Sequence, residues 1–318
     1  MSPHAQVLAL AGALLADACF ETPNALHPVA WFGTLALAVV ARSPTRGRLR
    51  PALVGAGIAL GLPLLAVAAA QLLLSQLQTL SPLLHLAAQA FFLHATFALF
   101  GLLRAGQRLA EALRTQGLDA ARVRLRWLCS RDPSSLDATG LVTGTIESLA
   151  ENLSDSLVAP LFFWLCAGLP GALAYRAVNT LDAMIGYHGR YEWLGKTSAR
   201  LDDLANLIPA RLTALLLATA ALSMDSSVSL RLGLRTWWHD RRATASPNAG
   251  HPMSMAAGLL GVRLDKSGHY VLGATLRAPE LHDVERCVVL VRRAGLLACV
   301  FAGWLAWQYG YGAQHGGL

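Results

Sequence analysis

The stretch RDPSSLDATGLVTGTIESLAENLSDSLVAPLFFWL, Arg131–Leu165, opens the segment around which the fold is organised. The segment continues to Arg211 through AYRAVNTLDAMIGY, Ala174–Tyr187, and SARLDDLANLIPARL, Ser198–Leu212. Its surroundings are mostly Leu, Ala and Val, where acids are costly unless they are paired, bound to a metal or functional. We therefore expect the catalytic core at residues 131–211. Nine of the protein's 19 acidic residues lie there: Asp132, Asp137, Glu147, Glu151, Asp155, Asp182, Glu192, Asp202 and Asp203.

The composition is that of a polytopic membrane protein. Of 318 residues, 54% are apolar and only 14% are charged, and the mean hydropathy is +0.45. The net charge of +7 comes almost wholly from arginine. In a membrane protein this excess sets topology and contacts anionic headgroups, so we expect no nucleic-acid partner. The predicted fold is all-α, one integral membrane domain over residues 1–318, with broken or re-entrant helices and helical loops on the cytoplasmic side.

Three segments match the template of a membrane-spanning helix: Pro51–Leu74, Pro82–Leu103 and Val288–Tyr309, that is, spans near 51–74, 82–103 and 288–309. The basic loop Arg42–Arg50 precedes the first span and contains no acid, which places it in the cytoplasm. A mainly polar, basic region follows at 223–286.

Two apolar segments carry breaks. Ser156–Ala174 contains Pro160 and the sequence GLPG, and Leu207–Met224 begins with Pro209. If both were ordinary spans, residues 176–206 would lie on the opposite side of the membrane from the preceding acids. Broken helices are tolerated where the exposed backbone is buried in protein or lines a cavity. We therefore predict that at least one of the two segments is re-entrant or discontinuous.

Glu147, Glu151 and Asp155 are spaced four residues apart, so on a helix they form one stripe, with Asn152 beside it. Like charges at this spacing repel each other, and a hard divalent cation removes the conflict. Mg²⁺ prefers one or two carboxylates together with phosphate oxygens and water. The alternative is a solvated helix face; we favour binding of metal or of a metal-bound phosphate.

Two further blocks repeat this mixture of acids, amides and guanidinium groups. Such a mixture suits a site that handles metal-bound phosphates, where arginine clamps the anion. The alternative is structural ion pairing between short helices. The residues concerned are Arg176, Asn179, Asp182, Arg200, Asp202, Asp203, Asn206 and Arg211.

Some polar residues have structural explanations instead. Asp137 is expected to cap a helix start. In the second span, His85, Gln89 and His94 are expected to form satisfied interhelical hydrogen bonds. The triplet Gly195–Thr197 is not a nucleotide-binding P-loop, because Arg190 stands where that motif needs glycine.

Taken together, these motifs resemble the CobD/CbiB family of cobalamin-biosynthesis membrane proteins, the adenosylcobinamide-phosphate synthases. The likeness runs from about Asp17 to Gly273. The sequence departs from the family at Glu21–Pro23, where the family usually has Gly-Asp-Pro, at Pro133, where it usually has Thr, and near Asp265-Lys266, where it usually has two glycines. The blocks that carry the resemblance are ESLAENLSD (147–155), APLFF (159–163), AYRAVNTLDAMIGY, SARLDDLANLIPARL, SPN (246–248) and AGLLGVRL (257–264), with HPVAWFG (27–33) near the start.

The resemblance implies ATP-dependent amide ligation of adenosylcobyric acid with aminopropanol phosphate or a related amino-alcohol phosphate, giving adenosylcobinamide phosphate. It implies Mg²⁺ as cofactor and ATP as co-substrate. The expected metal ligands are Glu147, Glu151, Asp155 and Asp182. The expected catalytic acids are these four with Asp202 and Asp203, one of which would take the proton of the attacking ammonium. The expected substrate- and phosphate-binding residues are Arg131, Asn152, Arg176, Asn179, Arg200, Asn206, Arg211, Ser246 and Asn248.

The implied location is the cell (inner) membrane, with several spans and an active site on the cytoplasmic side. The implied partners are the corrinoid substrate, the amino-alcohol phosphate and the lipid bilayer. A homo-oligomer and an association with other cobalamin-pathway enzymes are both compatible with the resemblance. Two other readings stay open: an AmpE-like membrane signalling or sensor protein without ligase activity, and a transporter, since broken helices with intramembrane acids are typical of transporters.

Overall fold

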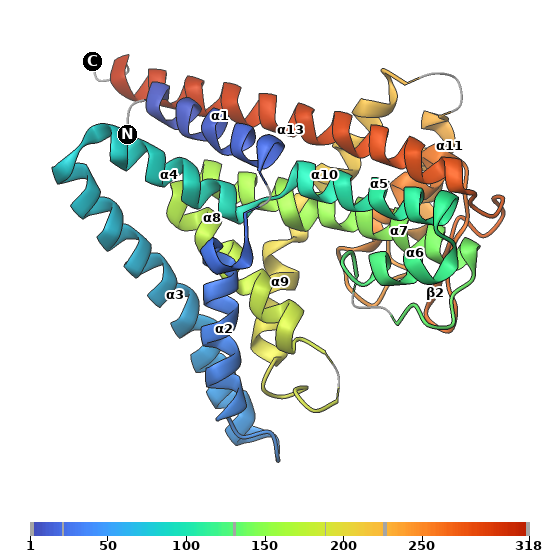
Figure 1. Cartoon of the computed structure of the whole chain (residues 1–318), viewed down its shortest axis with the longest axis horizontal. Coiled ribbons are helices and arrows are strands. Elements are labelled where there is room, and N and C mark those ends of the chain that lie inside the picture. Colours follow the sequence, from blue (N-terminus) through green and yellow to red (C-terminus); the bar gives the residue numbers. More distant parts are fainter. Residues whose placement is uncertain (1–2, 21, 130–131, 188, 225–227, 316–318) are drawn as a thin grey trace. The chain divides into compact units, whose positions relative to one another are not determined.

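The computed structural model describes residues 3–20, 22–129, 132–187, 189–224 and 228–315 (Figure 1). Over these residues the chain is helical almost throughout. The strands found there are β1, Leu264–Lys266, and β2, Tyr270–Leu272, which pair antiparallel with Leu264 opposite Leu272. The predicted all-α class is confirmed.

Three helical segments are long and apolar enough to cross a membrane: Leu49–Leu80, Ala138–Ile185 and Leu281–Gln308. Two helix pairs pass the same test but are interrupted by a short break, so the described residues contain three to five candidate spans. This agrees with the predicted polytopic membrane fold. The expected span 82–103 is one of the interrupted pairs, because the backbone becomes extended at Phe97, with φ −135° and ψ 163°.

Contacts divide the chain into two compact units. The first comprises residues 1–98, 159–205 and 300–318, and the second comprises residues 99–158 and 206–299. Each unit brings together stretches that are far apart in the sequence, so each has its own packing.

In the first unit, α8 is the central helix and contacts α2, α3, α4 and α9, while α1 packs on α4. Proline at the first helical turn starts α2 and α4. The preceding His27 and Ser81 cap them, since the His27 Nδ1 accepts a hydrogen bond from the Val29 amide at 3.3 Å. The elements are α1 Pro3–Cys19, η1 Asn24–Leu26, α2 Pro28–Ala41, α3 Leu49–Leu80, α4 Pro82–Thr96, α8 Ala159–Ile185, α9 Lys196–Ala205 and the end of α13.

Helix α8 is discontinuous. Ala167 and Gly168 leave the helical conformation, and Gly168 has φ +65°, which a residue with a side chain adopts only with strain. Pro170 follows, and its ring cannot join a regular helical ladder. The prediction that at least one of the two apolar segments, 156–174 and 207–224, is re-entrant or discontinuous is therefore confirmed by the first of them.

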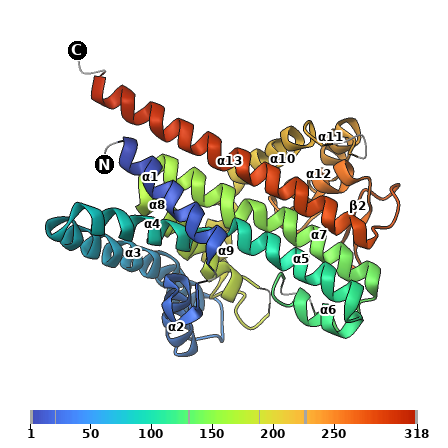
Figure 2. The same ribbon diagram turned by 45° about the horizontal axis from the view of Figure 1, so that its top comes forward.

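In the second unit, α12 is completely buried and packs against α7, α10 and α11. Figure 2 shows α5 lying along α7, as their contacts require. The elements are α5 Leu99–Thr115, α6 Leu118–Leu125, α7 Ala138–Leu153, the π-helical turn η2 Ser154–Val158, α10 Leu207–Ala221, α11 Leu230–Asp240, α12 Gly250–Leu260, β1, β2 and the first part of α13, which runs over Leu281–His315. Asp137 caps α7, as predicted, by accepting the Gly140 amide at 2.7 Å.

Candidate functional site

The acids of the first motif lie on α7 and on the π-helical turn that follows it. Glu147 is buried, with 5% of its surface exposed, and Glu151 and Asp155 are partly buried. Asp155 lies within the π-helical turn η2 and not on a regular α-helix. The expected stripe of three acids on one α-helical face therefore holds for Glu147 and Glu151 but is not regular at Asp155. Such π-turns are frequent at functional sites.

Asn152 ties this helix to the preceding segment. Its side-chain Nδ2 donates to the Ser148 carbonyl at 2.9 Å and to the Leu128 carbonyl at 3.4 Å. The amide thereby holds the segment that follows α6 against α7. Arg131, one of the predicted phosphate-binding residues, lies outside the described residues.

A second group of predicted residues meets between α8 and α9 in the first unit. The Arg176 Nη1 donates to the Asn179 Oδ1 at 3.4 Å, and the Asn179 Nδ2 donates to the Asp202 Oδ1 at 3.1 Å. Two sequence blocks are thus joined through one amide. All three side chains are partly buried.

Asp182 occupies the last turn of α8 and folds over Gly186. A Cβ on Gly186 would lie 1.9 Å from the Asp182 Oδ1, so the carboxylate is accommodated there only because residue 186 has no side chain. The Gly186 amide donates to the Asp182 carbonyl at 2.7 Å. On α9, Arg200 lies 3.9 Å from the Asp203 carboxylate, but 74% of the Arg200 side chain is exposed, which makes this pair weak.

The remaining predicted residues gather in the second unit around the start of α12. The Arg211 Nη1 donates to the Asn248 Oδ1 at 3.5 Å, and Asn248 is buried. The Ser246 Oγ accepts the backbone amides of Asn248 and Ala249 at 3.2 and 3.5 Å. Asn206, also buried, stands at the N-cap position of α10.

Arginine charges act on His251 beside this third group. Burial, assisted by the charges of Arg211, Arg241 and Arg242, lowers the pKa of His251 to about 4. The His251 Nδ1 accepts the indole N–H of Trp237 at 3.1 Å, so the neutral imidazole carries its proton on Nε2. A neutral His251 adds a hydrogen-bond donor for an anion without adding a positive charge that would repel the neighbouring arginines.

Some buried polar residues lie outside the set predicted to form the site. Asp17 and His94 are buried in the first unit, and the Thr22 Oγ1 lies 3.0 Å from the His94 Nε2. Burial, followed by the charges of Arg176 and His94, lowers the pKa of His27. The signal in the sequence was an acid within an apolar helix and the block HPVAWFG. Of the second span's polar residues, His85 makes the expected interhelical hydrogen bond, since its Nδ1 lies 2.9 Å from the Leu74 carbonyl oxygen. The Gln89 Nε2 contacts His85 on the same helix, and the buried Gln89 Oε1 and His94 Nδ1 have no hydrogen-bond partner within the described part of the chain, so the expectation is only partly met.

The donor set fits a hard cation, because carboxylate and amide oxygens are the ligands that Mg²⁺ takes. Within the described ranges, no three His, Cys, Asp or Glu side chains are grouped closely enough to hold a metal ion by themselves. A magnesium ion here would have to take further oxygens from phosphate and water, which is its usual behaviour. Magnesium binding stays a proposal.

Comparison with known proteins identifies the group to which these motifs belong. A family model described as CobD/Cbib protein matches residues 10–292. The chain belongs to the CobD/CbiB family. The match covers all three groups of described site residues, and also Asp17 and His94.

Curated CobD/CbiB proteins align over most of their length. The chain is 39% identical over 287 residues to the cobalamin biosynthesis protein CobD of Dehalococcoides mccartyi, covering 90% of this chain and 92% of that protein. It is 38% identical over 307 residues to CobD of Mycobacterium tuberculosis, covering 94% and 95%. It is 36% identical over 277 residues to the cobalamin biosynthesis protein CbiB of Salmonella paratyphi B, covering 82% of each. No solved structure matches the chain significantly.

Proposed function

We propose that this protein is a membrane enzyme of cobalamin biosynthesis that ligates adenosylcobyric acid to aminopropanol phosphate, or a related amino-alcohol phosphate, at the expense of ATP. The product would be adenosylcobinamide phosphate. The observation that carries the proposal is membership of the CobD/CbiB family over residues 10–292. The oxygen ligands and arginines of the three groups described above support it.

The proposed chemistry has two steps. A propionate carboxylate of the corrinoid attacks the γ-phosphorus of ATP, which gives an acyl phosphate and ADP. The amine nitrogen of the amino-alcohol phosphate then attacks the acyl carbon, the carbon–oxygen bond to phosphate breaks, and inorganic phosphate leaves. The ammonium must first lose a proton, which a nearby carboxylate such as Asp202 or Asp203 accepts.

The residues divide the work by their chemistry. Glu147, Glu151 and Asp155 would supply carboxylate oxygens to Mg²⁺ in the second unit, and Asp182 would do so in the first unit. When bound, this ion neutralises the charge of the transferring phosphoryl group. Arg200 and Arg211 would hold phosphate oxygens. Asn179 orients Asp202 through the hydrogen bond of 3.1 Å, which fixes the carboxylate for proton acceptance.

Around α12, the Ser246 and Asn248 side chains lie with Arg211 beside the neutral His251. This group is suited to the phosphate of the amino alcohol. Arg176, Asn152 and Asn206 complete the proposed polar lining of their own units.

The test is a ligation assay. Purified protein in detergent is incubated with adenosylcobyric acid, aminopropanol phosphate and Mg·ATP, and the product is measured by mass spectrometry. We expect adenosylcobinamide phosphate and one ADP per product. No product from a folded protein, with substrates that a known CobD/CbiB relative converts, would rule the ligase proposal out.

Two substitutions connect the assay to the site. Glu151→Gln and Asp182→Asn each remove one negative charge at nearly constant shape, and we expect turnover to fall by at least about 100-fold. Asp119→Asn is the control, because the Asp119 side chain is 95% exposed and is not a proposed site residue. Full activity in both site variants would remove the metal assignment.

The broken helix α8 favours transport as a second candidate function. A transporter would move the corrinoid into sealed vesicles without ATP-dependent change in its mass. The same purified protein in proteoliposomes distinguishes the two functions, because only ligation yields a new compound.

A further inference from the structure

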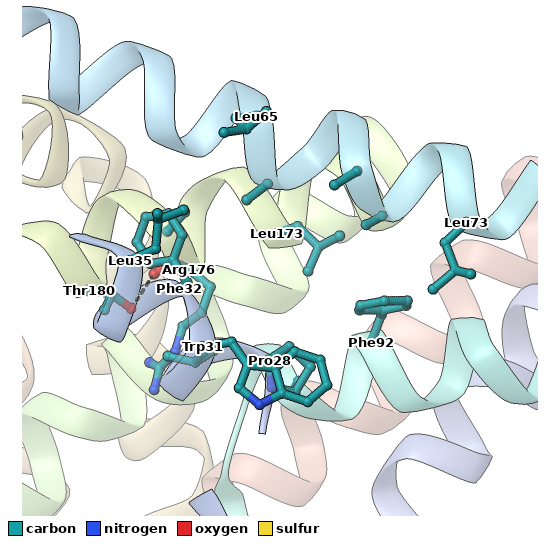
Figure 3. A pocket seen from close by; sticks show the side chains of 16 residues that line it. Pro28, Trp31, Phe32, Leu35, Leu65, Leu73, Phe92, Leu173, Arg176 and Thr180 are labelled. Atoms are coloured by element: carbon teal, nitrogen blue, oxygen red, sulfur yellow. Dashed lines mark hydrogen bonds between the residues drawn. The ribbon is translucent and has the colours of Figure 1, made fainter. Parts of the chain in front are cut away.

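A pocket of about 510 Å³ lies within the first unit, between α2, α3, α4 and α8. This volume is in the range of small-molecule sites, roughly 300–1,000 Å³. Its wall is aliphatic and aromatic, and Figure 3 shows Phe32, Leu173, Leu65, Leu73 and Phe92 around it. Such a wall accepts hydrocarbon and offers almost nothing to a polar ligand.

The pocket has one ionisable lining residue among those described, Arg176. In Figure 3 the Arg176 side chain lies at the same end as Trp31 and Thr180, and Leu73 and Phe92 stand at the opposite end. The Thr180 hydroxyl donates to the Arg176 carbonyl at 2.7 Å, and the Trp31 indole N–H donates to the Ala25 carbonyl at 2.8 Å. The polar recognition that the pocket provides is therefore a guanidinium at one end.

The charge of Arg176 acts on this end of the pocket. It contributes, after burial, to lowering the pKa of His27, the residue directly before the pocket-lining Pro28. Guanidinium binds carboxylate and phosphate through its planar fork of donors, so an anionic group is the complement of this end.

The wall of the pocket that α3 forms is partly exposed on the protein surface. Leu65 and Leu73 are 57% and 47% exposed, and both belong to α3, a candidate membrane span. Apolar side chains exposed on a spanning helix face the hydrocarbon of the bilayer. The pocket is thus accessible to a molecule that already resides in the membrane.

From the apolar wall, the single cation at one end and the exposure on a spanning helix, we propose that the pocket binds one anionic phospholipid. An acyl chain lies along α3 and α8, and the headgroup phosphate is held by Arg176. The amide-rich corrinoid is a poor occupant, because its polar groups would be buried without partners. The inference does not rest on the proposed ligation, although Arg176 takes part in both proposals, and its test measures bound lipid instead of turnover.

Two neighbouring alanines on α3 test the chain-binding part. Ala68 and Ala69 are both exposed, but only Ala69 lines the pocket. Ala69→Phe fills the pocket, whereas Ala68→Phe places the same ring on the surface of the same helix. Delipidated full-length protein is titrated with phosphatidylglycerol, and bound lipid is counted by native mass spectrometry. We expect Ala69→Phe to weaken the first binding event at least about tenfold and Ala68→Phe to change it less than about twofold.

The headgroup part is tested by comparing phosphatidylglycerol with phosphatidylcholine of the same chains. We expect wild type to prefer the anionic lipid about fivefold, as for one basic side chain at an anionic lipid. Arg176→Gln should abolish this preference, and Arg190→Gln, which removes an exposed cation of the same unit, should keep it.

Three outcomes of the lipid titrations would overturn the proposal. They are equal loss in the Ala68 and Ala69 variants, no loss in either, and a preference for phosphatidylglycerol that survives Arg176→Gln. Retained melting temperatures show that the variants are folded. If Ala69→Phe does not fold, Ala66→Phe repeats the pocket-filling test. A second protein chain bound in place of lipid would also overturn it, and would appear as doubled mass.

Discussion

At the scale of single residues, Asp283 is an acid outside the proposed site that has several charged hydrogen-bond donors. It is completely buried near the start of α13, where its carboxylate accepts both Arg277 Nη groups at 2.7 Å, the Arg286 Nη1 at 2.8 Å and the Glu280 amide at 2.9 Å. The hydrogen bond to Asp283 is the main reason why the pKa of Arg277 is raised. A buried carboxylate with this many charged donors is stable only while its partners remain.

Asp283→Asn should therefore destabilise the protein by about 2–4 kcal/mol, because two arginines lose their counter-charge. Unfolding in mixed micelles measures the change. Asp119→Asn is the control, since its exposed pair with Arg122 is worth at most about 1 kcal/mol. Equal effects of the two substitutions would show that burial of Asp283 carries no energetic weight.

His251 gives a pH-dependent prediction. Its folded pKa is about 4, below the ordinary value of 6.5, so the unfolded chain binds the proton more readily between these values. The stabilisation is fully present above pH 6.5 and is lost progressively as pH falls towards 4. Melting temperature against pH should thus slope less in His251→Gln than in wild type over this window. The exposed His239→Gln is the control; an unchanged slope in His251→Gln would contradict the prediction.

At the scale of elements, the backbone of α3 at Gly55 lies directly against the backbone of the segment before α9. A Cβ on Gly55 would lie 1.9 Å from the Leu194 carbonyl oxygen, so the helix and the segment before α9 touch without an intervening side chain. A Cβ on Gly57, two residues along the same helix, would meet no neighbouring atom within 4 Å. The same residue type thus serves tight packing at one position and not at the other.

Gly55→Ala should cost about 1–3 kcal/mol, because the added methyl forces the helix and the loop apart. Gly57→Ala should instead stabilise the helix by about 0.5–1 kcal/mol, as alanine is the better helix former. The free energies of unfolding of the two variants, measured side by side, test this. A stabilising Gly55→Ala would show that the close approach does not exist.

At the scale of the whole molecule, the question is which loops share a side of the membrane. Within the first unit, the Arg48 guanidinium lies 5.4 Å from the centre of the Trp193 ring, next to the contact between Gly55 and Leu194. The loop between α8 and α9 therefore lies at the same end of α3 as the basic loop Arg42–Arg50. Because that loop is expected in the cytoplasm, so are the polar residues at the end of α8.

Cysteine accessibility tests this arrangement. In a variant without the five native cysteines, Arg46→Cys and Arg190→Cys should react with an impermeant maleimide only after the cells are opened. Gln78→Cys, at the other end of α3, should react in intact cells. Labelling of Arg190→Cys together with Gln78→Cys, and not with Arg46→Cys, would place the end of α8 outside the cytoplasm.

Much of the fold follows from local patterns. Hydropathy and the absence of charge predict α3, because a spanning helix needs only about 20 apolar residues in sequence. Asp137 can likewise be predicted as a helix cap from local sequence, because a cap acts on backbone amides within three residues of itself. The break in α8 could be predicted because glycine and proline restrict their own backbone.

Composition and motifs along the chain are sufficient to predict the helical membrane class, the family and the types of residue at the candidate site. Which of these residues meet depends on how the helices pack. The hydrogen bond from Asn179 to Asp202, the approach of Thr22 to His94 and the pocket ending at Arg176 join positions far apart in the sequence. Spacing along a chain carries no information about such contacts, because they arise when separate helices pack and bury their surfaces together.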